Sequence, residues 1–209
     1  MTAKDRELES ARLDIEARAA SLDRIAAENE ALKYSLSSAQ SKSVSESSRD
    51  GVSTDLVRAL QAALKDSPSL EQALLIVDAL YGDRIVVLDT AYSSAKDSDR
   101  GGFQYGSKGL ELLMALADDY WSDLIAGKSD QVARSKFGRN GFAAKESETI
   151  SVEGRKRRTF RYKDQDIIME KHLKHGVKDS YAETLRIHFE WLQNDKVIVI
   201  GHCGKHLNF

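Results

Sequence analysis

The side chains best suited to chemistry gather near the C-terminus of this sequence. All five histidines lie between residue 172 and the end of the chain, and the single cysteine lies among them. These residue types bind metals, transfer protons or hold phosphate groups. The residues concerned are His172, His175, His188, His202, Cys203 and His206.

One interpretation of this cluster is a metal site. His202 and His206 are four residues apart, Cys203 lies between them, and His172 or His188 could supply a further nitrogen ligand. The spacing permits zinc but does not specify it, because the sequence has neither a second cysteine nor a His-Glu-x-x-His motif. We therefore expect no metal or other cofactor.

A second interpretation is acid–base chemistry on a phosphodiester without metal. Such a reaction needs a group that accepts a proton, a group that donates one, and cations that hold the phosphate charge. Apolar residues alternate with Arg186 and His188 along residues 184–192, which predicts a strand with these two side chains on a solvent-facing side. The predicted catalytic set is Arg186, His188, Lys205, His206, His202 and His172.

A basic stretch, "GRKRRTFRYK" at residues 154–163, strengthens the case for a polyanion. Its cations alternate with Phe160 and Tyr162, which could stack on bases. The formal net charge of the chain is only -2, so anion binding has to come from such local clusters. The predicted nucleic-acid contacts are Arg155, Lys156, Arg157, Arg158, Arg161 and Lys174.

A third interpretation assigns these residues no chemistry. The basic stretch could be an edge strand whose solvated arginines prevent aggregation. The histidines could donate hydrogen bonds to the backbone, and Gly201 and Gly204 could permit a turn.

The elements that must position these residues begin with a heptad repeat. One set of positions spaced by seven is Leu8, Ile15, Leu22, Asn29 and Leu36, and the second set is Ala11, Arg18, Ile25 and Leu32. The narrow apolar stripe favours a coiled coil over a helix docked on the globular body, and Asn29 fixes the register of a parallel pair. We expect a parallel homodimer through residues 4–36, with a seam of Leu8, Ile15, Leu22, Ile25, Asn29, Leu32 and Leu36.

Two further regions follow the helix, which occupies residues 1–36. Residues 37–51 are rich in serine and predict a flexible linker. Residues 52–209 have the pattern of a globular domain. Helices are expected at 54–67, 69–83, 106–127 and 129–137, a short buried strand at 85–88, and strands at 148–152, 158–162, 166–170, 184–192 and 196–201.

The expected fold class is α+β. An N-terminal coiled-coil helix is followed by a helical layer, residues 52–136, that packs on a C-terminal antiparallel sheet, residues 145–209. A single cysteine excludes an internal disulfide, and we find neither a signal peptide nor an apolar run long enough to span a bilayer. We therefore expect a cytoplasmic protein with no membrane partner.

The last strands resemble a known family. The stretch "KHLKHG...TLRIHFEWLQNDKVIVIGHCGKHL" is similar to the central and final strands of RelE/ParE-like toxin domains. That resemblance implies a metal-independent endoribonuclease, as in the RelE branch, or action on gyrase, as in the ParE branch. Arg186 and His188 match the central-strand positions, and Lys205 and His206 match the C-terminal one. A coiled-coil stalk with a small terminal domain also resembles accessory proteins of bacterial antiphage defence.

The sequence thus predicts a coiled-coil-tethered domain that binds RNA or another polyanion. Metal-free cleavage is the activity that its residue types would allow if it is an enzyme. The alternative is a non-enzymatic module in which the coiled coil assembles subunits and the sheet docks a protein partner.

Overall fold

The computed structural model describes residues 22, 25, 29, 53–145, 151–176, 180 and 182–207. The chain divides into two units, Met1–Ser53 and Thr54–Phe209. In the first unit Leu22, Ile25 and Asn29 are helical and exposed. The other predicted seam residues and the predicted linker lie outside the described residues, so the parallel dimer stays a prediction.

The second unit begins with helices that the sequence predicted. They are α2 (Thr54–Lys65), α3 (Leu70–Leu80), and a long helical run made of α5 (Gly106–Ala115), a π-helical turn η1 (Leu116–Tyr120) and α6 (Trp121–Ile125). α3 starts with a capping box, in which Ser69 accepts from the backbone N–H of Gln72 while the Gln72 side chain accepts from that of Ser69. This arrangement satisfies N–H groups that a helix start leaves without partners.

Several short helical segments follow these helices. They are α7 (Asp130–Ala133), a 3-10 turn η2 (Arg134–Phe137), α8 (Gly138–Gly141) and α9 (Val152–Lys156). α7 and η2 coincide with the helix predicted at residues 129–137.

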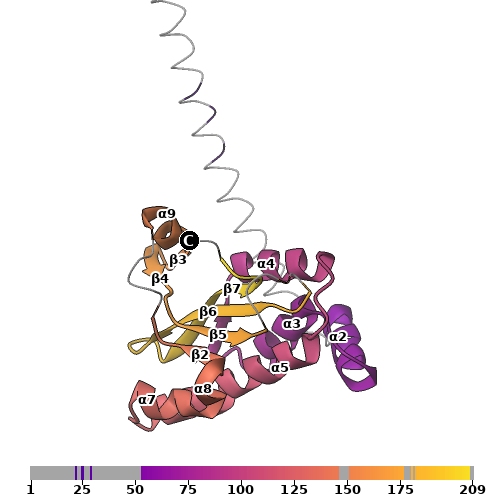
Figure 1. Cartoon of the computed structure of the whole chain (residues 1–209), viewed down its shortest axis with the longest axis horizontal. Coiled ribbons are helices and arrows are strands. Elements are labelled where there is room, and N and C mark those ends of the chain that lie inside the picture. The colour runs from indigo at the N-terminus through magenta and orange to yellow at the C-terminus, as the bar shows by residue number, and fades with distance from the viewer. Residues whose placement is uncertain are drawn as a thin grey trace, which may run out of the picture. The chain divides into compact units, whose positions relative to one another are not determined.

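A five-stranded sheet forms the centre of the domain. Its order is β1-β7-β6-β5-β2, and the strands are β1 (Ile85–Val87), β2 (Phe142–Ala143), β5 (His172–His175), β6 (Leu185–Leu192) and β7 (Val197–Gly204). A separate hairpin pairs β3 (Thr159–Tyr162) with β4 (Gln165–Ile168). In Figure 1 the hairpin and α9 lie on the side of the sheet away from α2, α3 and α5.

The two sides of β6 face different surroundings. Leu185, Ile187 and Phe189 belong to the main core, which they form with residues of α3, α5 and η1. A smaller core on the other side contains Phe160, Met169 and Val199. Because side chains alternate along a strand, Arg186 and His188 point toward this second side.

The helix α4 (Asp89–Arg100) covers an edge of β7 that no strand pairs with. β1 pairs with β7 only as far as Ile200. Beyond Ile200, hydroxyl groups of α4, spaced by one helical turn, bind the backbone of β7 and of the residue after it. Thr90 Oγ1 donates to Gly201 O, and Ser94 Oγ binds both the N–H and the C=O of Cys203. The Lys205 N–H donates to Ser98 Oγ. A helix thus satisfies the backbone groups of a sheet edge, which would otherwise invite pairing with another chain.

The α+β class is confirmed, but several details of the prediction are wrong. Strands β2 and β5 were not predicted, and the strands expected at 158–162 and 166–170 form the separate β3–β4 hairpin. The sheet is mixed rather than antiparallel, because β1 runs parallel to β7. Ser151 and Val152, predicted to end a strand, cap and begin α9 instead. Helix α4 was not predicted at all, because its buried residues are small, Ala91, Ala95 and Ser98, and give no apolar stripe.

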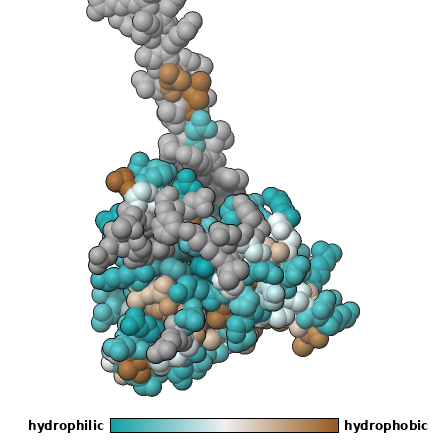
Figure 2. Space-filling model, viewed as in Figure 1, coloured by the Kyte–Doolittle hydropathy of each residue, from teal (hydrophilic) through white to brown (hydrophobic). Residues whose placement is uncertain are grey.

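The face of the domain shown in Figure 2 is mostly hydrophilic, with small separate apolar spots. Single exposed apolar side chains such as Leu64 and Val152 are ordinary on a protein surface. Among the residues described, we find no helix with the length and apolar character needed to cross a membrane.

Candidate functional site

Strand pairing brings three of the predicted histidines into one row. His172 on β5 lies opposite His188 on β6, and His188 lies opposite His202 on β7. The His172 and His188 rings are stacked with centroids 4.6 Å apart, and the His188 and His202 rings meet edge to face at 5.6 Å. We call these three residues the imidazole row.

The imidazole row is buried, so the prediction of a solvent-facing patch is wrong. His188 is 1% exposed, and His172 and His202 are 6% exposed. Phe160 and Met169 close over the neighbouring Gly201, where a Cβ atom would lie only 2.5 Å from the Phe160 ring. A β-bulge between His188 and Phe189 accommodates Gly201 and keeps His202 beside His188.

Each ring of the row has a backbone carbonyl as partner. His172 Nδ1 is 3.0 Å from Glu170 O, His188 Nδ1 is 3.1 Å from Met169 O, and His202 Nε2 is 2.8 Å from Lys205 O. A carbonyl oxygen only accepts, so in each pair the ring nitrogen donates. The hydrogen bonds therefore assign one tautomer to each neutral ring.

Burial keeps His188 and His202 neutral near pH 7. It is the main reason why the pKa of His188 lies well below its usual value of 6.5, and the charges of His172 and His202 lower it further. Burial also lowers the pKa of His202 to about 4, with a smaller contribution from the nearby Arg158 guanidinium. Buried rings cannot reach a bound phosphodiester to exchange protons with it, so the catalytic roles predicted for these three histidines do not fit the structure.

The residues considered as metal ligands are not arranged to bind a metal either. Cys203 is fully buried in the main core, and burial raises the pKa of its thiol. Within the described ranges no group of three histidine, cysteine, aspartate or glutamate side chains is arranged to hold a metal ion.

The two remaining members of the predicted C-terminal set lie beyond β7. Lys205 is exposed and His206 is half-buried. Their charges lower the pKa of His202, which places them near the end of the row.

Arg186 is also buried, with 7% of its surface exposed, so its predicted solvent-facing position is wrong; it lines a cavity of about 420 Å³ at the edge of the sheet. Strand β2 has only two residues and pairs with Leu173 and His172, so the rest of β5 runs past it without a partner from β2. The cavity forms at this place and is lined by Asn140, Gly141, Lys174, His175, Gly176 and Arg186. We call it the basic cavity.

The basic cavity has a positive lining. Two of its six lining residues, Lys174 and Arg186, are cations, and none of the six carries a carboxylate. One Arg186 nitrogen, Nη1, donates to the carbonyl oxygens of His175 (3.1 Å) and Leu185 (2.7 Å), which fixes the guanidinium at the wall. Lys174 lies directly opposite Arg186 in the strand register.

His175 is the only histidine among the residues that line this cavity. Burial, followed by the charges of Lys108 and Arg186, lowers its pKa, while Glu111 acts in the opposite direction. The ring of Tyr105 meets it edge to face, with centroids 4.9 Å apart. The adjacent Gly176 has φ +73°, and a Cβ there would lie 1.7 Å from Glu183 O, so only glycine fits this turn.

The predicted nucleic-acid contacts also divide into exposed and buried residues. Arg155, Lys156, Arg157 and Arg161 are exposed on α9, β3 and the turn between them. Arg158 is 1% exposed, and its guanidinium donates to the carbonyl oxygens of Gly154 (2.9 Å) and Leu207 (3.1 Å). The role predicted for Arg158 is therefore wrong, because this arginine ties α9 to the end of the chain.

Sequence reasoning missed His175, Gly176 and Asn140 as lining residues. His175 was noted among the five histidines but was not placed at a site. The pair His175-Gly176 could have indicated its position. Glycine often marks a tight turn, so Gly176 would have placed His175 at the end of a strand. Asn140 comes from a distant segment, and nothing in its local sequence points to the cavity.

No family model, curated protein or solved structure matches the chain. The resemblance of the last strands to RelE/ParE-like domains stays a prediction. The chemistry of the basic cavity is what bears on function.

Proposed function

We propose that the domain formed by residues 54–209 binds RNA or another polyanion, with a phosphate group in the basic cavity. The observation that carries this proposal is the lining itself, which combines Lys174, His175 and Arg186 with no carboxylate. Arginine suits this role because its planar guanidinium can offer two parallel donors to phosphate oxygens.

A second group of exposed cations lies on α9 and the turn that follows it. Arg155 and Lys156 make no ion pair with any other described residue, whereas Arg161 is paired with Asp164 and Asp166. Contacts of this kind provide affinity that does not depend on sequence and that weakens as salt rises. The alternative of a protein-docking module would not require the cavity to carry this charge.

Metal-free cleavage is a narrower proposal, and it now depends on His175. Of the five histidines, only His175 lines the cavity in which Arg186 and Lys174 would hold the phosphate. Its lowered pKa favours the neutral ring that a general base requires. Incubating RNA with the protein in EDTA tests this step: cleavage that disappears in His175→Gln supports it, and intact RNA with the parent protein leaves binding alone.

The binding proposal is tested by fluorescence anisotropy with a labelled single-stranded RNA. Lys174→Glu should weaken binding about tenfold near 0.1 M salt, because it reverses a charge at the phosphate site. The new carboxylate would face Arg186 across the strands, so we expect the fold to tolerate it.

Lys65→Glu is the matched control. Lys65 is exposed at the end of α2, and its replacement changes the net charge by the same amount. Equal affinities for the two variants, or no binding by the parent protein, would contradict a phosphate site in the basic cavity.

A further inference from the structure

A second cavity lies at the other end of β6. It has a volume of about 610 Å³ and sits between the turn of the β3–β4 hairpin and the turn that joins β6 to β7. Apolar surface comes from Tyr162, Ile167 and Leu192, and side-chain amides come from Gln165, Gln193 and Asn194. We call it the amide cavity.

Its charge distinguishes the amide cavity from the basic one. Lys163 Nζ is 2.9 Å from a carboxylate oxygen of Asp195, and these are the only charged residues that line it. Because the two charges neutralise each other, the cavity offers no net attraction to a phosphate group. It suits an uncharged ligand with an apolar face and polar edges.

A nucleobase is a ligand of that kind. Single-stranded RNA is recognised by stacking its bases on aromatic rings and by hydrogen bonds to the base edges. Tyr162 lines the cavity, with Lys163 Nζ 5.3 Å from the centre of its ring, and an aromatic ring can stack on a base. Glutamine and asparagine amides each offer both donors and acceptors. None of the three amide side chains is engaged in a hydrogen bond with another residue that the structure describes.

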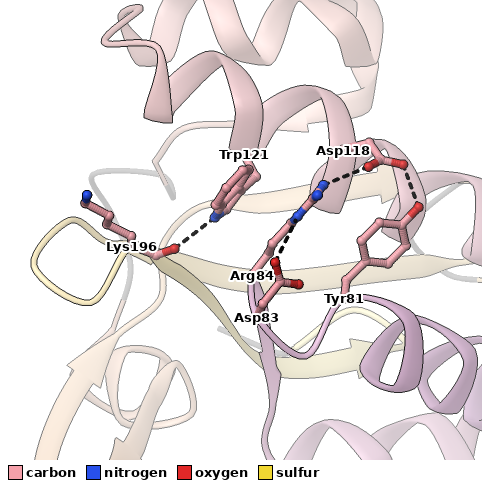
Figure 3. Close-up of polar contacts among 6 residues, drawn as sticks. All are labelled: Tyr81, Asp83, Arg84, Asp118, Trp121 and Lys196. Atoms are coloured by element: carbon pink, nitrogen blue, oxygen red, sulfur yellow. Dashed lines mark hydrogen bonds and ion pairs between the residues drawn. The ribbon is translucent and has the colours of Figure 1, made fainter.

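The turn that supplies two of these amides is held in place from both sides. On the hairpin side, Lys163 binds Asp195. On the helical side, Trp121 Nε1 donates to Lys196 O over 2.8 Å (Figure 3). The backbone of Lys196 has φ +55°, a conformation that non-glycine residues adopt rarely and that such contacts help to maintain.

Trp121 is itself fixed by a small network. The Arg84 guanidinium lies 4.8 Å from the centre of the Trp121 ring and binds Asp118 at 3.0 Å, and Asp118 also accepts from the hydroxyl of Tyr81 (Figure 3). The π-helical turn η1 contains Asp118 and directly precedes Trp121. Fixed walls reduce the entropy lost when a ligand binds.

We infer that the amide cavity accepts a nucleobase of the same single strand whose phosphate occupies the basic cavity, an inference that rests on the proposed function. Arg186 at one cavity and Trp191 at the other are five residues apart on β6, or about 17 Å at the rise of a strand. A short oligonucleotide can cover that separation.

Abasic RNA separates base binding from phosphate binding. The parent protein should bind a short single-stranded oligonucleotide about tenfold more tightly than an abasic oligonucleotide of the same length. Tyr162→Leu should remove most of that difference, and Tyr162→Phe should retain it because the ring remains. Lys174→Glu should weaken binding of both oligonucleotides. Circular dichroism would verify that each variant is folded.

The other outcomes would contradict the nucleobase site alone or both proposals together. Equal binding of the two oligonucleotides by the parent protein, or equal effects of Tyr162→Leu and Tyr162→Phe, would overturn the nucleobase site while leaving the phosphate site standing. Failure of the parent protein to bind either oligonucleotide would overturn the proposed function and this inference together.

Discussion

At the scale of single residues, the histidines show how similar side chains acquire different roles. His188 and His175 belong to paired strands, yet His188 is 1% exposed while His175 lines a cavity. The alternation in residues 184–192 predicted correctly that His188 and Arg186 share a side. It could not show that α9 and the β3–β4 hairpin would cover that side, because these segments lie elsewhere in the sequence.

Burial of neutral histidines makes stability depend on pH. The pKa of His202 is about 4 in the folded protein and 6.5 in the unfolded chain, so between these values the unfolded chain binds more protons. Stability is complete above about pH 6.5 and is lost as the pH falls toward 4. Because one pKa unit corresponds to about 1.4 kcal/mol, His202 alone should lower the free energy of unfolding by about 3 kcal/mol at pH 4.

Urea unfolding at a series of pH values would measure this loss. His202→Gln keeps an N–H donor for Lys205 O but does not titrate, so its stability should fall less steeply below pH 6.5. Identical slopes for the variant and the parent protein would show that His202 does not contribute to the acid sensitivity.

At the scale of elements, local signals predicted those parts of the fold that depend on local sequence. The capping box at Ser69 and the turn between β6 and β7 can both be recognised within a few residues. The parallel pairing of β1 with β7 could not be predicted, because more than one hundred residues separate Ile85 from Ile198. Helix α4 escaped prediction because hydroxyl groups rather than an apolar stripe attach it to the sheet.

The hydroxyl groups of α4 should therefore contribute measurably to stability. Ser94→Ala would leave the N–H and C=O of Cys203 without their partner, and we expect a loss of about 1–3 kcal/mol in the free energy of unfolding. Ser93→Ala on the exposed side of the same helix is the control and should be nearly neutral.

Chemical denaturation gives both values, and hydrogen exchange of the Cys203 amide reports the local effect. If Ser94→Ala were as stable as Ser93→Ala, with the Cys203 amide equally protected, the helix would not be sealing the sheet edge through this serine.

At the scale of the whole molecule, the predicted coiled coil would bring two binding domains together. Two linked copies that engage one RNA bind more tightly than either copy alone, because the second contact becomes intramolecular. The heptad pattern predicts this arrangement from sequence, whereas the basic cavity required the structure, since Asn140, Lys174 and Arg186 come from three separate segments.

Replacement of Asn29 tests the self-association. Light scattering of the parent protein should give twice the chain mass of 23.2 kDa. Asn29→Leu should change the oligomeric state, because a buried asparagine at this heptad position favours a parallel pair over larger assemblies. A monomer both before and after the change would contradict the coiled coil.

The most direct test of the central claim is the salt dependence of RNA binding. Each phosphate contact made by a lysine contributes about one unit to the slope of log affinity against log salt concentration. We predict that Lys174→Gln lowers the magnitude of this slope by about one, while Lys65→Gln leaves it unchanged. The same slope for the parent protein and Lys174→Gln would contradict a phosphate held in the basic cavity.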